Sequence, residues 1–597
     1  MTKKILWMMV SGLMVLSLVM AACGPAETPT TPTTPTTPTT PTTPTTPTTP
    51  TTPTTPTTRD PEWYGTTERP QYGGTFTMRV NADFAHWDTY YGGNTAARLW
   101  QENLTTANFM QIPPSVNDFR TRLTTIEQYK GLLAESWEIN DYQTVTFHIR
   151  KGVHFPNVAP MNGREMTAYD AEYCWQRLLG LGSGFTEPTR YVNVVKLNLI
   201  TSAVATDKYT FVVKLSKPSV TQMREVMEDY NAQYIMPADA LKLWGNLDIA
   251  QHNFGTGPFI LKEYIPGSTV YAVRNPDYWG YDEHYPEDRL PYVDAVRVLI
   301  MPDNSTADAA LRTGKLDFAM NETWEQVDSL KKTTPNLKVA PQPGSANAIF
   351  MQVDTKPFDD VRVRKAMQMA INLKTISESY YGGTASSIPP GMVLAQGWRT
   401  EYKDWPQDVK DGYAYNPEGA KALLKEAGYP NGFKCTFALQ SIYVDLFSIV
   451  AAYFKDVGIE MTLDVKDVGA FNAYINSGQA QMSYGAQFGV TPPMPSIAYR
   501  TSTSSYYPRT HIKDPIFDEM YFKADAAVDM DEQQALVKEC DAYIIKQQWT
   551  TVLPAPTTYY VYQPWVQRYT GMGMTERFGV IFSRLWIDQV LKKSMGR

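Results

Sequence analysis

Hydrophobic and polar residues alternate along the first half of the chain in a way that predicts strands and a helix. Between 145 and 149 every second residue is apolar, the period of a half-buried strand, and residues 137–155 are predicted to form a hairpin. Residues 209–215 alternate in the same way. Between them, Thr167 is a predicted N-cap of an amphipathic helix that ends at Gly180.

Further along, a helix is expected to begin at Asn304 or Ser305 and to end at Gly314, and a strand follows around 316–320. Asp360 is a predicted N-cap of a helix over 361–371.

The pattern then changes to one of strands that alternate with helices. Asn416-Pro417 opens a helix that Gly428 closes, with proline at its first position. Strands over 434–439 and 460–465 flank a predicted helix over 444–457. Strand, helix and strand in this order indicate a parallel α/β lobe.

The first residues have the layout of a secretory signal peptide. Lys3 and Lys4 precede an apolar run over 5–20, and small residues lead to Cys23. The segment resembles a bacterial lipobox, with Met20 where leucine is usual, and this resemblance implies cleavage after residue 22 and acylation of Cys23. An uncleaved anchor is the alternative, although the run is short for a span of about 20 residues.

A spacer follows the cysteine. From Pro29 to Pro56 a proline recurs at every third position, and the segment has no apolar side chains with which to form a core. Polyproline II has three residues per turn, and at about 3.1 Å per residue some thirty residues reach roughly 90 Å. We therefore expect residues 23–70 to be a lipidated cysteine followed by a stalk.

Composition narrows the function of the remaining body. The chain has 597 residues, too many for one simple core, and its net charge of -7 gives no basic surface for nucleic acid. Aromatic residues make up 12%, which fits either ligand recognition by flat side chains or large cores. Apart from Cys23 the cysteines are Cys174, Cys435 and Cys540, which allow at most one disulfide among themselves.

No catalytic motif is present. The chain lacks His-Glu-x-x-His, Gly-x-Ser-x-Gly and a Walker loop, and its six histidines have no metal-ligand spacing. His148 and His154 lie near each other, but on a strand and its turn, where an exposed hairpin face explains them. We expect no catalytic residues, no metal and no cofactor, and therefore no enzyme.

The order of short motifs resembles one protein family. The motifs are QYGGTF (71–76), LAESW (133–137), FHIRKGVHF (147–155), TAYDA (167–171), GTGPF (255–259), RNPDYW (274–279), LPYVD (290–294), GKLD (314–317), PFDDVRVR (357–364) and YNPE through LL to AGY (415–429). Together they resemble the extracellular solute-binding proteins of ABC importers, in the class for oligopeptides, dipeptides and nickel (family 5). The resemblance runs from Gln71 to about Gly432.

This resemblance implies an α/β fold of the periplasmic-binding-protein type, with two lobes around a hinged cleft and an extra subdomain inserted in the first lobe. It implies capture of a small solute, over which the two lobes close by a hinge motion. It also implies delivery of this solute to ABC permease and ATPase subunits. The protein is then expected to be a monomer on the outer face of the cell membrane, held by the lipid on Cys23, without nucleic acid.

The expected division of the chain follows from the same resemblance, with crossings between the lobes near residues 319–322 and 559–562. The segments are 1–22 (signal peptide), 23–70 (lipidated cysteine and stalk), 71–102 with 254–322 and 560–597 (lobe I), 103–253 (inserted subdomain) and 323–559 (lobe II).

The candidate ligand contacts are chosen by their place relative to the expected cleft. They comprise polar and aromatic residues after the first strand, one after the first crossing and two in the second lobe: Asp83, Trp87, Tyr90, Tyr91, Trp324, Gln487 and Phe488.

One departure from the family bears on the ligand. Peptide-binding relatives carry an acidic residue in the second lobe that pairs with the peptide's amino group, whereas no Asp or Glu occurs here between Asp467 and Asp514. Since a buried ammonium without a partner is costly, we expect either a ligand without a free amine there, namely a blocked or internal peptide, a glycan or an anionic compound, or another carboxylate such as Glu322 or Asp83 in place of the acid. A peptide-like solute, an oligosaccharide and a surface receptor without a transporter remain open.

Overall fold

The computed structural model describes residues 68–597 apart from positions 85, 91–95, 108–128, 190–196, 229–232, 345, 390, 394, 396, 488–492, 505, 570 and 572–577. The chain divides after Thr58, and the compact unit that begins at Arg59 holds every element described below. Cys23 and the proline-threonine segment lie outside the described residues.

The largest sheet in the described part joins segments from both ends of the chain. Its order is β10 (Phe259–Ile265), β11 (Thr269–Arg274), β12 (Ala295–Ile300), β1 (Thr75–Val80), β13 (Phe318–Glu322), β20 (Thr557–Tyr562) and β14 (Lys338–Pro343). β1 runs parallel to β12 and β13, while β20 is antiparallel to both of its neighbours. Phe76 packs against Phe318 and Phe582, with ring centroids 6.0 and 4.8 Å apart, so the C-terminal residues complete this core.

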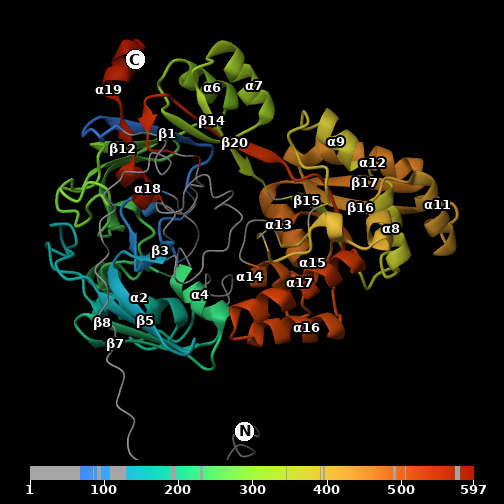
Figure 1. Ribbon diagram of the computed structural model, residues 1–597, viewed down its shortest axis with the longest axis horizontal. Helices are drawn as coiled ribbons and strands as arrows, with labels where there is room; N and C mark the ends of the chain where they lie inside the picture. Colours follow the sequence, from blue (N-terminus) through green and yellow to red (C-terminus); the bar gives the residue numbers. More distant parts are fainter. Residues whose placement is uncertain are drawn as a thin grey trace, which may run out of the picture. The chain divides into compact units, whose positions relative to one another are not determined.

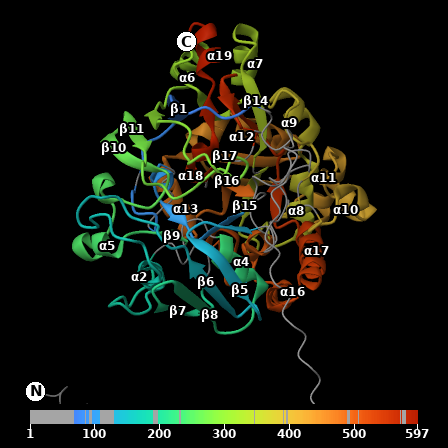
Figure 2. The same cartoon turned by 60° about the vertical axis from the view of Figure 1, so that its left-hand side comes forward.

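A four-stranded antiparallel sheet lies between β1 and β10 in the sequence. Its order is β5 (Ala134–Ile139), β6 (Thr144–Ile149), β8 (Thr210–Leu215) and β7 (Ile200–Asp207). Helix α2 (Ala168–Leu179) covers it, beginning at the Thr167 capping box and ending at Gly180, which has a φ of 69°. Both the hairpin and the helix predicted from the sequence are confirmed, and Figure 2 shows α2 beside these strands.

Short elements lie before and after the strands of that sheet in the sequence. They are η2 (Ala97–Leu99), the pair β2 (Glu102–Asn103) and β9 (Tyr234–Ile235), the pair β3 (Thr105–Ala107) and β4 (Tyr129–Gly131), α4 (Val220–Glu228), α5 (Ala238–Trp244) and η4 (Ala250–His252).

A five-stranded sheet forms a second body, and we call the seven-stranded and four-stranded sheets with their helices the first body. The order of the five-stranded sheet is β17 (Ile459–Lys466), β16 (Phe433–Gln440), β18 (Met482–Gln487), β15 (Ala346–Met351) and β19 (Thr550–Val552). β16 and β17 are parallel and are connected through α12 (Val444–Asp456), which confirms the predicted α/β unit. Figure 1 shows α8 (Val361–Met369), α11 (Pro417–Glu426) and α12 gathered around β16 and β17.

A helical layer with its own apolar cluster lies beside this sheet. Met494, Ile497, Phe517 and Val537 are buried together in it. Its helices are α14 (Pro493–Ala498), α15 (Tyr507–Thr510), α16 (Pro515–Ala526) and α17 (Met530–Gln547).

The other described elements complete the two bodies. They are α6 (Asn304–Arg312), α7 (Trp324–Thr333), α9 (Leu373–Ser379), η5 (Tyr402–Asp404), α10 (Gln407–Asp411), η6 (Ser441–Tyr443), α13 (Val468–Asn476), α18 (Phe578–Arg584), α19 (Gln589–Ser594) and the pair β21 (Val566–Gln567) and β22 (Trp586–Ile587). α6 begins at Asn304, as expected, with Asp303 as its N-cap.

The chain passes between the two large sheets at two adjacent points. β14 leads into β15 through Gly344, and β19 leads into β20 through residues 553–556. Gly344 N donates to Pro556 O at 2.8 Å, and an added Cβ would lie 2.7 Å from that oxygen. The first passage thus lies later than 319–322, because α7 and β14 intervene and β14 pairs with β20 in the first sheet. The second passage directly precedes β20.

The positions of the cysteines and histidines bear on whether the described residues form a disulfide or a metal site. Cys174, Cys435 and Cys540 are buried and free. His148 faces Glu138, whereas His154 contacts Gly163 O, so the two histidines have different partners. The described residues contain no group of His, Cys, Asp or Glu side chains suited to hold a metal ion. No helix within the described ranges has the length and apolar composition needed to cross a membrane.

Candidate ligand-binding site

A polar aromatic cluster lies in the second body beside the first passage. Asn347 is the second residue of β15, and its Oδ1 accepts a hydrogen bond from Tyr484 Oη at 3.2 Å. Asn347 Nδ2 is 3.1 Å from Tyr381 Oη. Tyr443 stacks on Tyr484 with 3.8 Å between ring centroids. We call Asn347, Tyr381, Tyr443 and Tyr484 the tyrosine cluster.

The tyrosine cluster offers flat faces and hydroxyl groups at a half-buried position. Tyr381, Tyr443 and Tyr484 are each partly exposed, whereas Asn347 is buried. Burial raises the pKa of Tyr484 and of Tyr381 well above the ordinary value, so both phenols stay neutral at physiological pH. Such side chains recognise polar organic molecules through stacking and hydrogen bonds rather than through charge.

Trp324 connects the two bodies at the hinge. It is the first residue of α7 on the first body, and its Nε1 donates to Tyr380 O of the second body at 3.3 Å. Tyr380 in turn contacts Tyr381 edge to face, with centroids 4.8 Å apart. The indole also lies against Gly382, where an added Cβ would come within 2.7 Å of the ring. Trp324 therefore adjoins the tyrosine cluster from the opposite body.

Adding a methyl group at Gly382 is expected to disturb this contact. Gly382 and Gly383 both have positive φ values, 58° and 76°, but only Gly382 has the indole nearby. Each Gly→Ala change is strained by about 1–2 kcal/mol because of φ. We expect Gly382→Ala to lower the free energy of unfolding by a further 1–3 kcal/mol or so from overpacking. Urea unfolding of both variants measures the difference, and equal losses would show that the indole contact is unimportant.

The predicted residues after β1 have partners inside the first body. Asp83 accepts hydrogen bonds from Tyr264 Oη at 3.0 Å and Gly267 N at 2.6 Å, and thereby joins the β10–β11 turn. Trp87 is buried, stacks on Trp100 at 5.9 Å and meets Tyr264 edge-on. In this conformation Asp83 is therefore engaged by hydrogen bonds and Trp87 by packing, both within the first body.

Tyr90 is fully buried and donates through its hydroxyl to Tyr234 O at 3.0 Å. The Arg177 guanidinium lies over its ring and pairs with Asp88, which is also fully buried. Asp88 additionally accepts from Leu247 N at 3.1 Å. This network holds α2 and β9 to the loop that follows β1.

The remaining predicted contacts are described only in part. Gln487 is the last residue of β18, and its backbone is paired with Ala346 at the start of β15. Its side chain, together with Tyr91 and Phe488, lies outside the described residues. The backbone position of Gln487 nevertheless shows that β18 ends beside the start of β15, where Asn347 lies.

Neither carboxylate considered as a replacement for the missing acid is free. Asp83 binds the β10–β11 turn, as described above. Glu322 is fully buried and pairs with Arg79 Nη1 at 3.0 Å, and Gln326 donates to its other oxygen. Burial raises the pKa of Glu322 to about 7, against the lowering by Arg79. Both acids are thus engaged by protein groups.

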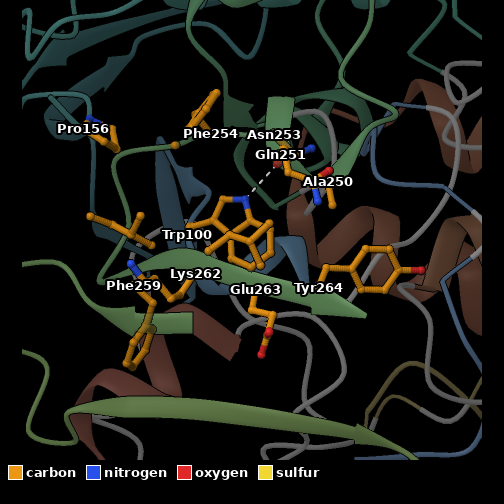
Figure 3. A pocket seen from close by; sticks show the side chains of 13 residues that line it. Trp100, Pro156, Ala250, Gln251, Asn253, Phe254, Phe259, Lys262, Glu263 and Tyr264 are labelled. Carbon is orange, nitrogen blue, oxygen red and sulfur yellow. Dashed lines mark hydrogen bonds between the residues drawn. The ribbon is translucent and has the colours of Figure 1, made fainter. Parts of the chain in front are cut away.

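A separate cavity of about 130 Å³ lies on the first body (Figure 3). Trp100 lies at its centre and donates through Nε1 to Asn253 Oδ1 at 2.9 Å, and β10 supplies Phe259 through Tyr264 along one wall. Pro156 of the four-stranded part also lines it. None of the predicted ligand residues is in this lining, and its walls do not include the second body.

The second contact between the bodies lies far from the hinge in sequence. Thr221 of α4 accepts a hydrogen bond from Gln533 Nε2 of α17 at 3.0 Å, and both side chains are buried. Glu225 of α4 lies close enough to Tyr499 and Tyr521 to raise the pKa of each phenol, although burial is the larger cause. The four-stranded part and the helical layer therefore touch in this conformation.

Asn347, Tyr381, Tyr443 and Tyr484 were not among the residues predicted from the sequence. Tyr484 did fall in the stretch that was singled out for its lack of acids. Asn347 meets Tyr484 only through the pairing of β15 with β18, which joins residues about 140 positions apart, and Tyr381 and Tyr443 come from other segments.

Comparisons with known proteins agree on one family. The profile described as "Bacterial extracellular solute-binding proteins, family 5 Middle" matches residues 128–508. Heme-binding protein A of Haemophilus influenzae is 31% identical over 354 residues, which cover 56% of this chain and 60% of that protein. The match thus spans less than two thirds of that relative's length.

Solved structures extend the likeness in fold to most of the chain. The periplasmic binding protein DppA of Helicobacter pylori, in complex with the peptide STSA, has a TM-score of 0.69 at 23% identity, covering 87% of this chain and 99% of its own. AgaA from A. tumefaciens R10, in complex with agropinic acid, has a TM-score of 0.67 at 20% identity, covering 86% and 99%. The fold is therefore the two-lobed, hinged α/β fold of periplasmic binding proteins.

Proposed function

Because the chain belongs to the bacterial extracellular solute-binding proteins of family 5, a family of binding proteins and not of enzymes, we propose that it captures a solute between its two bodies and delivers it to the permease of an ABC importer. The observation that carries the proposal is the pair of adjacent passages at Gly344 and 553–556, with the tyrosine cluster beside them. Two parallel connections allow the bodies to open and close as units.

The solute that we favour is a peptide or peptide-like molecule. According to their names, the relatives described above bind heme, the peptide STSA or agropinic acid, all of which are organic molecules. Asp83 and Glu322 both have protein partners, so a free amino group on the solute has no ready carboxylate among these candidates. An N-blocked peptide or an anionic solute fits this arrangement better than a free peptide, and an oligosaccharide is the alternative.

The contacts that we assign to the solute lie at the hinge. We place them at the tyrosine cluster and Trp324, with the end of β18 at Gln487 as their neighbour. Tyr91 and Phe488 remain proposed contacts from the sequence. Asp83, Trp87 and Tyr90 support the first body through the internal contacts described above.

The N-terminal segment is proposed to tether this body to the membrane. Cleavage after residue 22 would leave Cys23 as an acylated N-terminus, and the proline-threonine stalk would hold the body away from the outer face of the cell membrane. Partners would be the permease and ATPase subunits, with the binding protein a monomer. Absence of transporter genes beside its own gene would favour a surface receptor.

If the two bodies close over the solute, the contact between α4 and α17 is expected to contribute modestly to solute affinity. Thr221→Val keeps the side-chain shape but removes the acceptor for Gln533 Nε2. A net hydrogen bond contributes about 0.5–1.5 kcal/mol, so we expect solute affinity to fall by about two- to tenfold. Titration calorimetry measures this, with Gln534→Ala on the same helix as the control. Unchanged affinity would mean that the contact forms equally in the open state.

Thermal unfolding of residues 71–597 tests the proposed function. The protein is heated with pools of free peptides, N-acetylated peptides, oligosaccharides and organic acids. A solute at 100 times its Kd stabilises the folded state by about 2.7 kcal/mol, which is readily measured. A shift with N-acetylated peptides or acids supports the proposal, a shift with oligosaccharides alone supports the alternative, and no shift with any pool contradicts solute capture.

A further inference from the structure

One fully buried arginine has no anionic partner in the described part of the chain. Arg500 follows α14 and has no exposed surface. Its guanidinium lies over the Phe350 ring, 5.0 Å from the centroid, and Nη2 approaches Met392 Sδ at 3.5 Å. Nε and Nη1 have no hydrogen-bond partner among the described residues.

A second unsatisfied polar group lies on the same face of the sheet. Ser483 of β18 is directly opposite Phe350 of β15, and residues opposite each other in an antiparallel pair project to the same face. Ser483 is 1% exposed, and its Oγ also lacks a partner among the described residues. Two guanidinium nitrogens of Arg500 and one hydroxyl are thus unsatisfied around the same Phe350 ring.

The charge of Arg500 makes this arrangement costly without an anion. Burial lowers its pKa to about 10, so the guanidinium remains protonated at neutral pH. An uncompensated buried charge is strongly destabilising, and contact with an aromatic ring leaves the N–H groups unsatisfied. No Asp or Glu occurs between Asp467 and Asp514, so the chain around Arg500 supplies no acid to pair with it. Arg509, the other arginine of this span, differs because it donates to Asn476 Oδ1 at 2.7 Å.

The location connects this arginine with the space between the bodies. Tyr499, the preceding residue, interacts with Glu225 of α4 on the first body. Ser483 directly precedes Tyr484 in β18, so its side chain and that of Tyr484 project to opposite faces of the five-stranded sheet, and Ser483 shares its face with Phe350 and Arg500. Arg500 is therefore close to the surface that α4 covers in this conformation, and separation of α4 from the helical layer would open a path toward it.

We propose that Arg500 and Ser483 form an anion subsite that receives a carboxylate of the captured solute. The guanidinium Nε and Nη1 donate to the carboxylate oxygens, and Ser483 Oγ donates a third hydrogen bond. The inference rests on the proposed solute capture and deepens it, because it assigns the solute to the class of organic acids.

Paired acids and amides test this assignment on the full-length chain. Thermal unfolding is measured with N-acetylated di- and tripeptides that carry a free C-terminal carboxylate, and with the same peptides as C-terminal amides. The variants are Arg500→Met, Ser483→Ala and, as a matched control that removes a cation with a protein partner, Arg509→Met. We expect the acids to stabilise the unmodified protein and Arg509→Met, and the amides to have little effect.

For Arg500→Met we expect acid binding to weaken at least tenfold, together with a higher melting temperature without solute, since an unpaired buried charge is gone. A purely structural arginine would give the opposite change in melting temperature. If Arg500→Met does not fold, Ser483→Ala decides, with a three- to tenfold loss of acid binding and no change for amides expected.

The inference is overturned if amides bind as well as acids, if Arg500→Met keeps the acid response, or if Ser483→Ala leaves acid binding unchanged. Binding of amides or of neutral sugars alone would leave solute capture standing and remove the anion subsite. Failure of every solute, neutral or acidic, to shift the melting temperature counts against both.

Discussion

Replacing Glu322 with methionine is expected to lower the free energy of unfolding by about 3–5 kcal/mol, the range found when one partner of a buried ion pair is removed. Glu322 is fully buried and Arg79 is 5% exposed, so the cation would remain in the protein interior without its carboxylate. Arg79 would keep Met301 O and Asn304 Oδ1 as acceptors, which satisfy N–H groups but do not neutralise the charge.

Denaturant unfolding measures this loss, and two further variants separate its causes. The double variant Arg79→Met with Glu322→Met removes both charges and is expected to recover most of the stability. Glu325→Met changes an exposed acid three residues away and should stay within about 0.5 kcal/mol of the unmodified protein. If the single and double Glu322 variants are equally unstable, the ion pair is not the cause. Because Glu322 lies two residues before the start of α7, the pair also fixes the helix that carries Trp324.

The second large effect is a change in pH dependence for Asp541→Asn. Asp541 of α17 is fully buried and accepts hydrogen bonds from Met392 N at 2.8 Å and Val393 N at 3.2 Å. Burial raises its pKa to about 7 in the folded protein, and the two backbone donors and Arg399 only partly offset this. Glu401 adds to the rise, while Tyr413 is a neutral neighbour whose own pKa is raised.

The sign of the effect follows from that shift. Because the folded pKa is above the unfolded value, the folded state binds the proton more tightly, and stability decreases as the pH rises from about 4 to 7. Asparagine keeps an oxygen for Met392 N and Val393 N but cannot ionise. We expect Asp541→Asn to match the unmodified protein near pH 4 and to exceed its stability by about 2–4 kcal/mol at pH 8.

Urea unfolding at both pH values measures this difference directly. Glu102 and Glu322 have pKa values raised to about 7 mainly by burial, and they contribute in the same direction to both proteins. The comparison must therefore be between the two proteins at each pH. An Asp541→Asn protein that is less stable at pH 8, or that keeps the full pH dependence, would contradict the raised pKa.

Asp541 and Arg500 both act on the segment that contains Met392. The carboxylate holds its backbone N–H, and the guanidinium contacts its sulfur. The two side chains do not pair with each other. Asp541 accepts hydrogen bonds from backbone N–H groups, whereas we propose that Arg500 binds an anion of the solute. This difference is why the Asp541 test concerns stability and the Arg500 test concerns the solute.

Local structure could be predicted from the sequence wherever it depends on nearby residues. The unit from β16 through α12 to β17 follows from periodicity, and Asp360 and Thr167 are caps as predicted. The motif order likewise indicated the family, since it reflects turns and caps that the fold requires.

The first passage between the bodies could not be predicted in this way. β14 contains Pro341 and Pro343, which read as breakers of a strand. The structure accommodates them because β14 is the last strand of its sheet, where one edge needs no partner. Consequently β14 belongs to the first sheet and α7 packs on it, with Val327 and Leu330 against Val561 of β20, although the predicted lobe boundary at residue 323 assigned both elements to the second lobe.

The candidate site likewise depends on contacts between distant residues that the sequence does not predict. Tyr90 follows β1, where cleft loops are expected, yet its hydroxyl binds a backbone oxygen 144 residues away. Asn347 and Tyr484 meet only because β15 pairs with β18 in one particular register. Residue type and position along the chain carry no information about such pairings, whereas the missing acid could be recognised because it concerns composition alone.

The central claim is that solute binding closes the two bodies, and the distance between α4 and α17 tests it most directly. Spin labels at the exposed positions Lys217, just before α4, and Glu532 on α17 report this distance by pulsed electron resonance. With a saturating solute found in the unfolding screen, we expect one narrow short distance, consistent with the Thr221–Gln533 hydrogen bond. Without solute, we expect a longer and broader distribution. The same distribution with and without solute would contradict capture by closure.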